Sequence, residues 1–174
     1  DRVRGTIAIP RSGKWYFEFT LGSAFYGYIG ISNIDGTKLV GRNEDGRKYT
    51  EAGHVSTPFA SITAGDIVGV ALDNNTTLTF YKNGVAESTT VSVDSNTDYF
   101  AMANFYNAIY ILNSGQRAFA YPVSGYKSLN TANLPDPTIA DGSQYFDTHL
   151  YTGNSSASQT LTLPFEPGMM WHKK

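Results

Sequence analysis

The sequence predicts an all-β protein, an antiparallel β-sandwich of two packed sheets, and three observations lead to this prediction. Tyr, Phe and Gly are abundant (12, 10 and 17 residues) and only 16% of residues are charged, which favours sheet with short turns. Residues 65–85 have the pattern of a hairpin, an apolar run followed by Asp and Asn turn residues and a returning strand. Residues 15–21 alternate between two faces, one of them made of Trp, Phe and Leu.

The N-terminal third of the chain predicts three strands. Residues 3–9 alternate apolar and polar side chains, which indicates a strand with one buried face. The second strand, at 15–21, is the most clearly amphipathic, and a turn at 22–25 follows it. Residues 26–32 are expected to return and pair with the second strand, with Gly27 and Gly30 leaving room for large neighbours.

Residues 33–61 lose this periodicity. They carry Gly36, Gly41, Gly46 and Gly53 among mixed charges and only short apolar pieces. A long segment of this kind is either a binding loop or a loop that includes two short edge strands and binds nothing.

The chain after the central hairpin predicts further strands. Residues 85–93 alternate Ser, Thr and Val, which is typical of an edge strand, and 94–98 form a loop. Residues 99–105 and 108–112 are expected to form an apolar hairpin with Tyr106 and Asn107 at its tip.

Several of these segments resemble the signature motifs of SPRY domains, in the same order along the chain. They are residues 13–18 (GKWYFE), 28–32 (YIGIS), 65–73 (GDIVGVALD) and 80–84 (FYKNG). Residues 113–122 resemble the closing strand of the family, with Ser114 where its usual Asn-Phe-Gly has Phe. The resemblance covers residues 1–122 and implies a concanavalin-like sandwich, but it does not fix a function, because one fold hosts many.

The remaining residues form a different kind of segment. Residues 123–138 contain two prolines and several Asn and Asp residues, and predict an extended connector. Strands at 145–152 and 159–163 would make residues 139–174 a β-hairpin extension or the start of a second β-rich module. From Gly125 onward the sequence resembles segments located after SPRY domains in tail and other virion proteins of bacteriophages, and both ends are expected to be cuts in a longer polypeptide.

Composition and motifs argue against several function classes. The net charge of −2 gives little support for nucleic-acid binding, and no run of about 18 apolar residues predicts membrane insertion. A glycosidase needs two carboxyls roughly 5–10 Å apart, and Glu18, the best strand carboxylate, has Tyr16 and Thr20 as same-face neighbours. Glu18 is therefore expected to be a structural hydrogen-bonding residue.

No cofactor or metal site is predicted. The three histidines, His54, His149 and His172, lack ligand spacing, and the acidic turns near 35 and 45 do not follow the calcium-loop pattern. There is no cysteine to bind a metal or act as a nucleophile.

Surface recognition is the function that remains. Tyr49, His54, Tyr106 and Asn107 are the residues expected at loop tips, where Tyr and Asn suit sugar stacking and protein interfaces alike. The sequence thus predicts a non-enzymatic binding or structural module of a bacteriophage virion, located in a tail, fibre or capsid-associated protein. Its expected partner is a host-surface glycan or a neighbouring virion protein, and homo-oligomerisation is left open. The alternatives are a cellular SPRY module that binds a short peptide and a polysaccharide-active enzyme.

Overall fold

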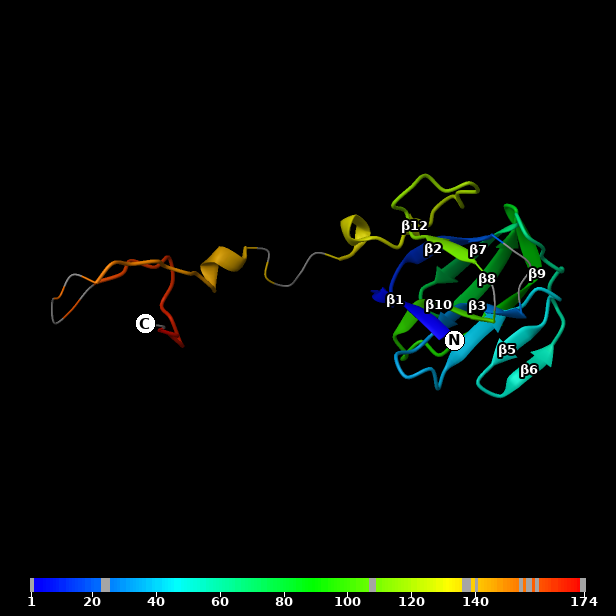
Figure 1. Cartoon of the computed structure of the whole chain (residues 1–174), viewed down its shortest axis with the longest axis horizontal. Helices are drawn as coiled ribbons and strands as arrows, with labels where there is room; N and C mark the ends of the chain where they lie inside the picture. The colour runs from blue at the N-terminus through cyan, green and yellow to red at the C-terminus, as the bar shows by residue number, and fades with distance from the viewer. Residues whose placement is uncertain are drawn as a thin grey trace. The chain divides into compact units, whose positions relative to one another are not determined.

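The computed structural model describes residues 2–22, 26–106, 109–135, 139, 141–153, 155, 158 and 160–172. The chain divides into two compact units, Asp1–Leu134 and Pro135–Lys174. All strands found among the described residues belong to the first unit (Figure 1).

The strands of the first unit are mostly short and succeed one another with few residues between them. They are β1 (Arg2–Ile9), β2 (Lys14–Leu21), β3 (Tyr26–Ser32), β4 (Leu39–Arg42), β5 (Lys48–Thr50), β6 (Gly53–Ser56), β7 (Ile67–Asp73), β8 (Thr77–Lys82), β9 (Val85–Ser92), β10 (Tyr99–Tyr106), β11 (Tyr110–Asn113) and β12 (Lys127–Ser128), followed by a 3-10 helix, η1 (Thr131–Asn133).

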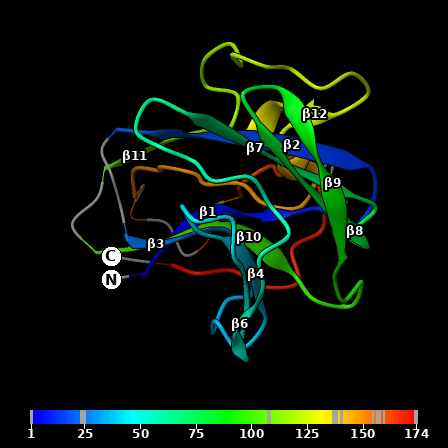
Figure 2. The ribbon, with the colours of Figure 1, turned by 90° about the vertical axis from the view of Figure 1, so that its right-hand side faces the viewer.

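Two sheets are built from these strands. Sheet A has the order β1-β10-β3-β4-β5-β6, and sheet B has the order β11-β2-β7-β8-β9, with β12 also pairing with β2. Every pair is antiparallel except β12 with β2. Figure 2 shows the sheets as separate layers, with β2 and β7 in one and β10 and β3 in the other. The predicted antiparallel sandwich is confirmed.

The core lies between the two sheets and uses alternate side chains of each strand. Phe17, Val70 and Leu72 have no exposed surface, and Trp15 is 3% exposed. The predicted inward face of residues 15–21 is therefore confirmed, because strand side chains alternate between faces.

The segment from β7 to β9 forms as its sequence predicts. Its first turn places Asn74 and Asn75 at φ 46° and 54°, and its second places Asn83 and Gly84 at φ 48° and 82°. Asn and Gly tolerate this left-handed region, which two-residue hairpin turns require. The third strand, β9, pairs with β8 and with no other described strand, and it is the predicted edge strand.

Two predicted strand pairings are wrong, because the chain crosses between sheets at both places. β3 does not return to β2: it lies in sheet A between β10 and β4. Likewise β10 belongs to sheet A and β11 to sheet B, so residues 99–112 are not a hairpin. A strand's own pattern shows that one face is buried, but it does not identify the neighbouring strand.

Residues 33–61 contain three strands rather than one long loop with two short ones. β4, β5 and β6 extend sheet A, and all four residues of β4 are buried. β4 was hard to recognise because it contains Gly41 and Arg42 beside its two apolar residues. Arg42 has no exposed side-chain surface and pairs with Glu87 of β9, with 2.7 Å between Nη1 and Oε1.

The predicted buried face of residues 3–9 is buried only toward the end of β1, where Ile7 packs partly buried against the core. Ile9 is 1% exposed, but Val3 is 54% exposed. The reason is that β1 is the last strand of sheet A, so that β10 is its one neighbour among the described strands.

Residues 114–126 cover the outer face of sheet B. Residues 118–122, expected as a closing strand, have no regular structure. Instead the backbone N–H groups of Ala120 and Tyr121 donate to the Glu18 carboxylate at 3.0 and 2.8 Å. Glu18 is 2% exposed, so its predicted role as a structural hydrogen-bonding residue is confirmed.

Part of the predicted connector belongs to the sandwich. Within residues 123–134, β12 pairs with β2, and Leu129 is 2% exposed in the core. The two-residue β12 carries no sequence signal of its own, which is why it was not predicted.

The second unit has little regular structure among its described residues. They form one 3-10 helix, η2 (Gly142–Gln144), and no strand, so the predicted hairpin is absent from the described part of 139–174. Its large apolar side chains are mostly exposed: Leu150 is 104% and Trp171 90% exposed. An isolated two-stranded hairpin without a covering layer is only marginally stable, which accounts for the failure of the prediction. Across the described residues, no helix is long and apolar enough to cross a membrane.

Candidate functional site

Three rings lie in contact on the outer face of sheet A. Tyr28 of β3 stacks on Tyr49 of β5 with centroids 5.1 Å apart and planes 14° apart. Tyr49 also contacts His54 of β6, at 5.9 Å and 47°. These residues point away from the core, since Tyr28 alternates with the buried Ile29 and Ile31 along β3.

Strand register and one glycine explain how the rings meet. Tyr49 is paired directly with His54 across β5 and β6, and with Gly41 across β4 and β5. Directly opposed residues on one face lie close enough for their side chains to touch. A Cβ atom at Gly41 would lie 3.0 Å from Cδ2 of Tyr28, so glycine leaves the space in which Tyr28 reaches across β4 to Tyr49.

Polar side chains of β10 and β1 continue the row of rings toward the β1 edge of sheet A. The Tyr28 hydroxyl accepts hydrogen bonds from Nδ2 of Asn104 and from Nη2 of Arg2, both at 3.1 Å. Arg2 lies on β1 and Asn104 on β10, where they are opposite each other. We call these five residues the sheet A row: Arg2, Asn104, Tyr28, Tyr49 and His54.

The sheet A row presents both aromatic and hydrogen-bonding groups. Arg2 and His54 are exposed, whereas Tyr28, Tyr49 and Asn104 are half-buried. The Tyr28 hydroxyl and the stacked Tyr28 and Tyr49 rings are held by neighbouring side chains without any partner. Such a row can bind a partner through ring edges, an imidazole and a guanidinium.

No protein-family model matches the chain. Among solved structures, the SPRY domain of human HERC1 superimposes with a TM-score of 0.56 at 16% sequence identity, covering 67% of this chain and 84% of that one. The fold is SPRY-like. The likeness supports the predicted sandwich, and at this identity it concerns the fold alone.

Two of the four predicted site residues come together in the SPRY-like sandwich. Tyr49 and His54 touch each other, but on paired strands rather than at loop tips. Tyr106 is the last residue of β10, and its side chain lies outside the described part of the structure, as does the whole of Asn107.

Sequence reasoning missed the other members of the sheet A row. The one available signal was at Tyr28, which alternates with Ile29 and Ile31 and must therefore face away from the core. Arg2 and Asn104 gave no signal, because they reach Tyr28 only through the pairing of β1, β10 and β3.

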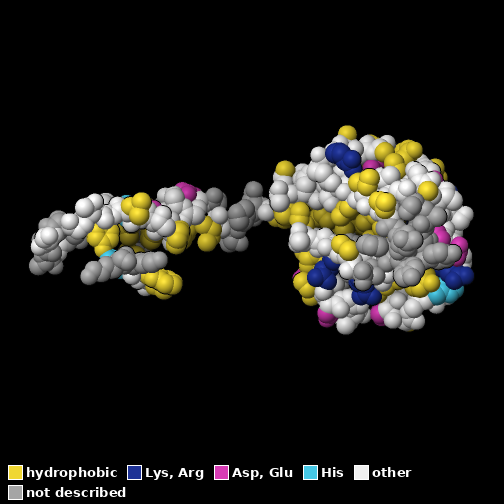
Figure 3. All heavy atoms as spheres, viewed as in Figure 1, with side chains coloured by type: hydrophobic (Ala, Val, Ile, Leu, Met, Phe, Trp, Pro, Cys, Tyr) yellow, Lys and Arg dark blue, Asp and Glu magenta, His cyan; other side chains and the backbone are white. Residues whose placement is uncertain are grey.

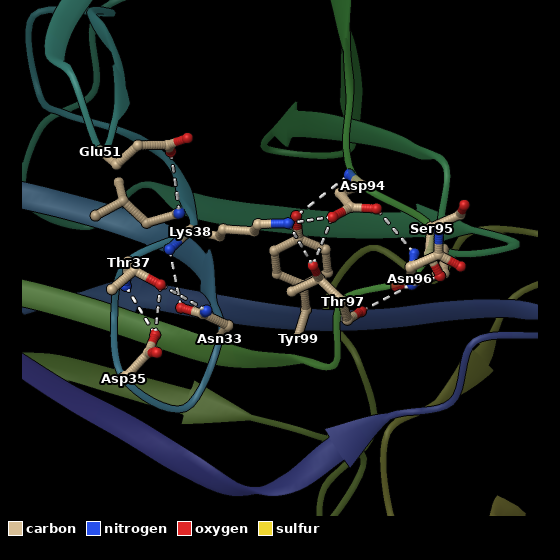
Figure 4. A network of polar contacts seen from close by, with 12 residues as sticks. Asn33, Asp35, Thr37, Lys38, Glu51, Asp94, Ser95, Asn96, Thr97 and Tyr99 are labelled. Carbon is tan, nitrogen blue, oxygen red and sulfur yellow. Dashed lines mark hydrogen bonds and ion pairs between the residues drawn. The ribbon is translucent and has the colours of Figure 1, made fainter.

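A second polar cluster joins two loops at one end of the sandwich, residues 33–38 and 94–98 (Figure 4). The Lys38 amine is directed at the Asp94 carboxylate and also donates to the Thr97 hydroxyl at 3.2 Å. Hydrogen bonds from Lys38, from the Asn96 N–H and from Thr97 lower the pKa of Asp94 to about 2. These groups satisfy one another, which favours a role in fixing the loops over ligand binding.

The acidic residues of this cluster are used locally. Asp35 accepts from the Thr37 N–H and hydroxyl at 3.0 and 2.7 Å, and these bonds lower its pKa. Within the described residues, no group of three His, Asp or Glu side chains could hold a metal ion.

Proposed function

We propose that this chain is a non-enzymatic protein-interaction module whose contact surface is the sheet A row. The observation that carries the proposal is the contact of Tyr28, Tyr49 and His54 on the outer face of a sheet, tied at one end to Arg2. Tyr and Arg are enriched at protein interfaces, and they contribute most when their neighbours hold them in place.

The geometry favours a protein partner over a glycan. Tyr28 and Tyr49 stack at an interplanar angle of 14°, so each ring covers one face of the other. A sugar needs an open ring face on which to stack, whereas a peptide can use ring edges and hydrogen bonds. The row therefore suits a protein or peptide surface.

An enzymatic role receives no support from Glu18. Its carboxylate is buried and accepts hydrogen bonds from Ala120, Tyr121 and the Tyr16 hydroxyl. A polysaccharide could reach it only if residues 118–121 moved away.

Selection from a displayed peptide library with the whole chain as bait tests this function. The dissociation constants of the enriched peptides are then measured for the wild type and for Tyr49→Ala and His54→Ala. We expect at least about tenfold weaker binding in both variants, as for residues at the centre of an interface. The control is Tyr145→Ala, which removes a 68% exposed tyrosine of the second unit.

Two results would contradict the proposal. Peptide binding that is unchanged in Tyr49→Ala and His54→Ala would place the contact surface elsewhere. Binding on a glycan array that is lost in the same variants, without any peptide binding, would assign the row to carbohydrate.

The placement of this module in a bacteriophage virion is a finer proposal. Its support is the resemblance of the sequence from Gly125 onward to segments located after SPRY domains in virion proteins. Mass spectrometry and electron microscopy of purified particles test it, and absence of the parent polypeptide from virions would overturn it. In that case the cellular alternative, recognition of a short peptide, would account for the same row.

A further inference from the structure

An apolar cavity of about 410 Å³ opens between the sheets on the side where β1 and β11 are the last strands. We call it the β1–β11 cleft. Figure 3, viewed as Figure 1, shows hydrophobic side chains at the surface of the sandwich on the side that carries β1. Its lining includes Val3 and Gly5 of β1, Ala101 and Ala103 of β10, and Phe19 and Leu112 of sheet B.

Small residues on sheet A create this space. A Cβ atom added at Gly5 would meet only Ala101, at 3.7 Å, which is an ordinary contact distance. At the rim, Val3 is 54% exposed and Ile109 63% exposed. Apolar side chains exposed around an apolar hollow are typical of an interaction site.

The opposite side of the sandwich shows what fills such a gap. There residues 57–62, which lack regular secondary structure, run between β4 and β8 and leave Phe59 and Ile62 only 6% and 3% exposed. The Phe59 ring lies 5.1 Å from that of Phe80, and the Phe59 N–H donates to the Gly46 carbonyl at 3.1 Å. A peptide segment that inserts an aromatic and an aliphatic side chain therefore closes that side.

The β1–β11 cleft offers an incoming segment a place for its backbone as well. β1 pairs with β10 along one edge, and no described strand pairs with its other edge. An added strand on an exposed sheet edge forms main-chain hydrogen bonds and points alternate side chains to one face. At β1 that face includes the cleft.

We propose that the β1–β11 cleft binds an extended peptide segment of a partner protein, which adds a strand to β1 and inserts an aromatic or aliphatic side chain between the sheets. This site is separate from the sheet A row, which lies on the outer face of sheet A. It adds a second contact to the proposed function and does not depend on the first.

The test uses the whole chain and an array of peptides of about ten residues, each with one aromatic and one aliphatic residue in a Ser/Thr background. Wild type is compared with Val3→Glu, which places a charge at the rim, and with Ala103→Phe, which fills the cleft. We expect at least about tenfold weaker binding in both. Val85→Glu is the matched control, because Val85 is 71% exposed on β9 at the other side of the sandwich.

Further measurements keep the outcome decisive. Circular dichroism verifies that each variant is folded. If Ala103→Phe does not fold, Val3→Glu alone tests the cleft, because Val3 is already exposed and its substitution should not disturb the core. Tyr49→Ala should leave this binding unchanged, which separates a failure of the cleft from a failure of the row. Two further peptides are compared, one N-methylated at its odd and one at its even residues, because the N–H groups of alternate strand residues point to opposite edges. The peptide whose methyl groups lie on the edge that faces β1 should bind at least about tenfold more weakly than the other.

Three results would overturn the inference. The first is binding that Val3→Glu and Ala103→Phe do not weaken. The second is binding of both N-methylated peptides as tight as that of the unmethylated peptide, which would show that the peptide adds no strand to β1. The third is a concentration-dependent dimer in sedimentation that Val3→Glu abolishes, which would make a second copy of the chain the occupant.

Discussion

At the scale of single residues, the Glu18 carboxylate holds residues 118–121 on the outer face of sheet B. It accepts the backbone N–H groups of Ala120 and Tyr121 and the Tyr16 hydroxyl while being 2% exposed. A buried carboxylate that receives several donors contributes more than a neutral hydrogen bond, and its loss leaves donors unpaired.

Glu18→Gln should therefore lower the free energy of unfolding by about 2–4 kcal/mol. The substitution replaces one carboxylate oxygen by an NH₂ group, which cannot accept a hydrogen bond and would lie against the donors that now bind that oxygen. Urea denaturation measures the change. Glu51→Gln is the control, since Glu51 is exposed and accepts a long hydrogen bond, from the Leu39 N–H at 3.4 Å. An unchanged midpoint for Glu18→Gln would show that the carboxylate does not hold this loop.

The Lys38–Asp94 pair predicts a pH dependence whose sign is set by the pKa of Asp94. That pKa is about 2 in the folded chain, below the ordinary 3.8, mainly because Lys38 donates to the carboxylate. The stability that Asp94 contributes is thus complete above pH 3.8 and is lost as the pH falls toward 2. Titration followed by NMR should give this low midpoint, and Lys38→Met should move it toward 3.8. A midpoint near 3.8 in the wild type would contradict the interaction.

At the scale of elements, the turn between β7 and β8 is tied to the loop before β10. Asn75 is buried at φ 54°, and its Nδ2 donates to the carbonyls of Ser95 and Thr97, both at 2.9 Å. The Asn75 side chain therefore connects the β7–β8 turn to the loop of residues 94–98, which is distant in sequence.

Asn75→Gly keeps the left-handed backbone but leaves both carbonyls without this donor, so it should destabilise the fold by about 1–3 kcal/mol. Asn74→Gly is the comparison at the neighbouring position: it also keeps a left-handed φ, 46°, but removes only exposed hydrogen bonds, from the Gly13 N–H at 3.0 Å and to Asp73 at 2.8 Å. Thermal unfolding of both variants provides the measurement. Equal effects would mean that backbone conformation, not the Asn75 amide, decides the stability of the turn.

Arg42 connects β4 of sheet A with β9 of sheet B. Its guanidinium pairs with Glu87 at 2.7 Å, donates to the Ala60 carbonyl and lies over the Phe59 ring, and burial lowers its pKa. Glu87 also accepts the Ala60 N–H at 3.2 Å. The ion pair thus fixes residues 59–60 between the sheets.

Arg42→Met should cost about 3–5 kcal/mol, because it leaves the Glu87 carboxylate buried without its cation. The double variant Arg42→Met/Glu87→Leu should recover a large part of that loss, since an apolar pair needs no counter-charge. Urea denaturation of the wild type, of Arg42→Met, of Glu87→Leu and of the double variant gives the double-mutant cycle. A double variant no more stable than Arg42→Met would rule out the unpaired charge as the cause.

The same elements show which parts of the fold could be predicted from the sequence. β7, β8 and β9 were predictable because their contacts are local and Asn74, Asn75, Asn83 and Gly84 specify the turns. The partners of β3 and β11 were not, because pairing across distant segments leaves no local pattern. The candidate site shows the same division: Tyr49 and His54 were chosen for their chemistry, whereas Tyr28 required the register of sheet A.

At the scale of the whole molecule, the buried core extends beyond residue 122, where the sequence predicted the end of the sandwich. Among the described residues, the core begins at Ile9 and ends at Leu129, and Leu134 packs against it partly buried. The segment after residue 122 also bonds back to the sandwich, since Nδ2 of Asn130 donates to the Gly115 carbonyl at 3.5 Å and β12 pairs with β2.

Compared with the whole chain and with a chain of residues 1–134, a chain that stops at residue 122 should consequently be less stable by about 2–4 kcal/mol. The shortest chain loses the fully buried Leu129, worth about 1.5–3 kcal/mol, together with the pairing of β12. Calorimetry of the three chains measures this, and Leu129→Ala in the whole chain separates the core side chain from β12. If the chain ending at 122 were as stable as the one ending at 134, residues 123–134 would be a connector as the sequence predicted, and Leu129 would contribute little to the core.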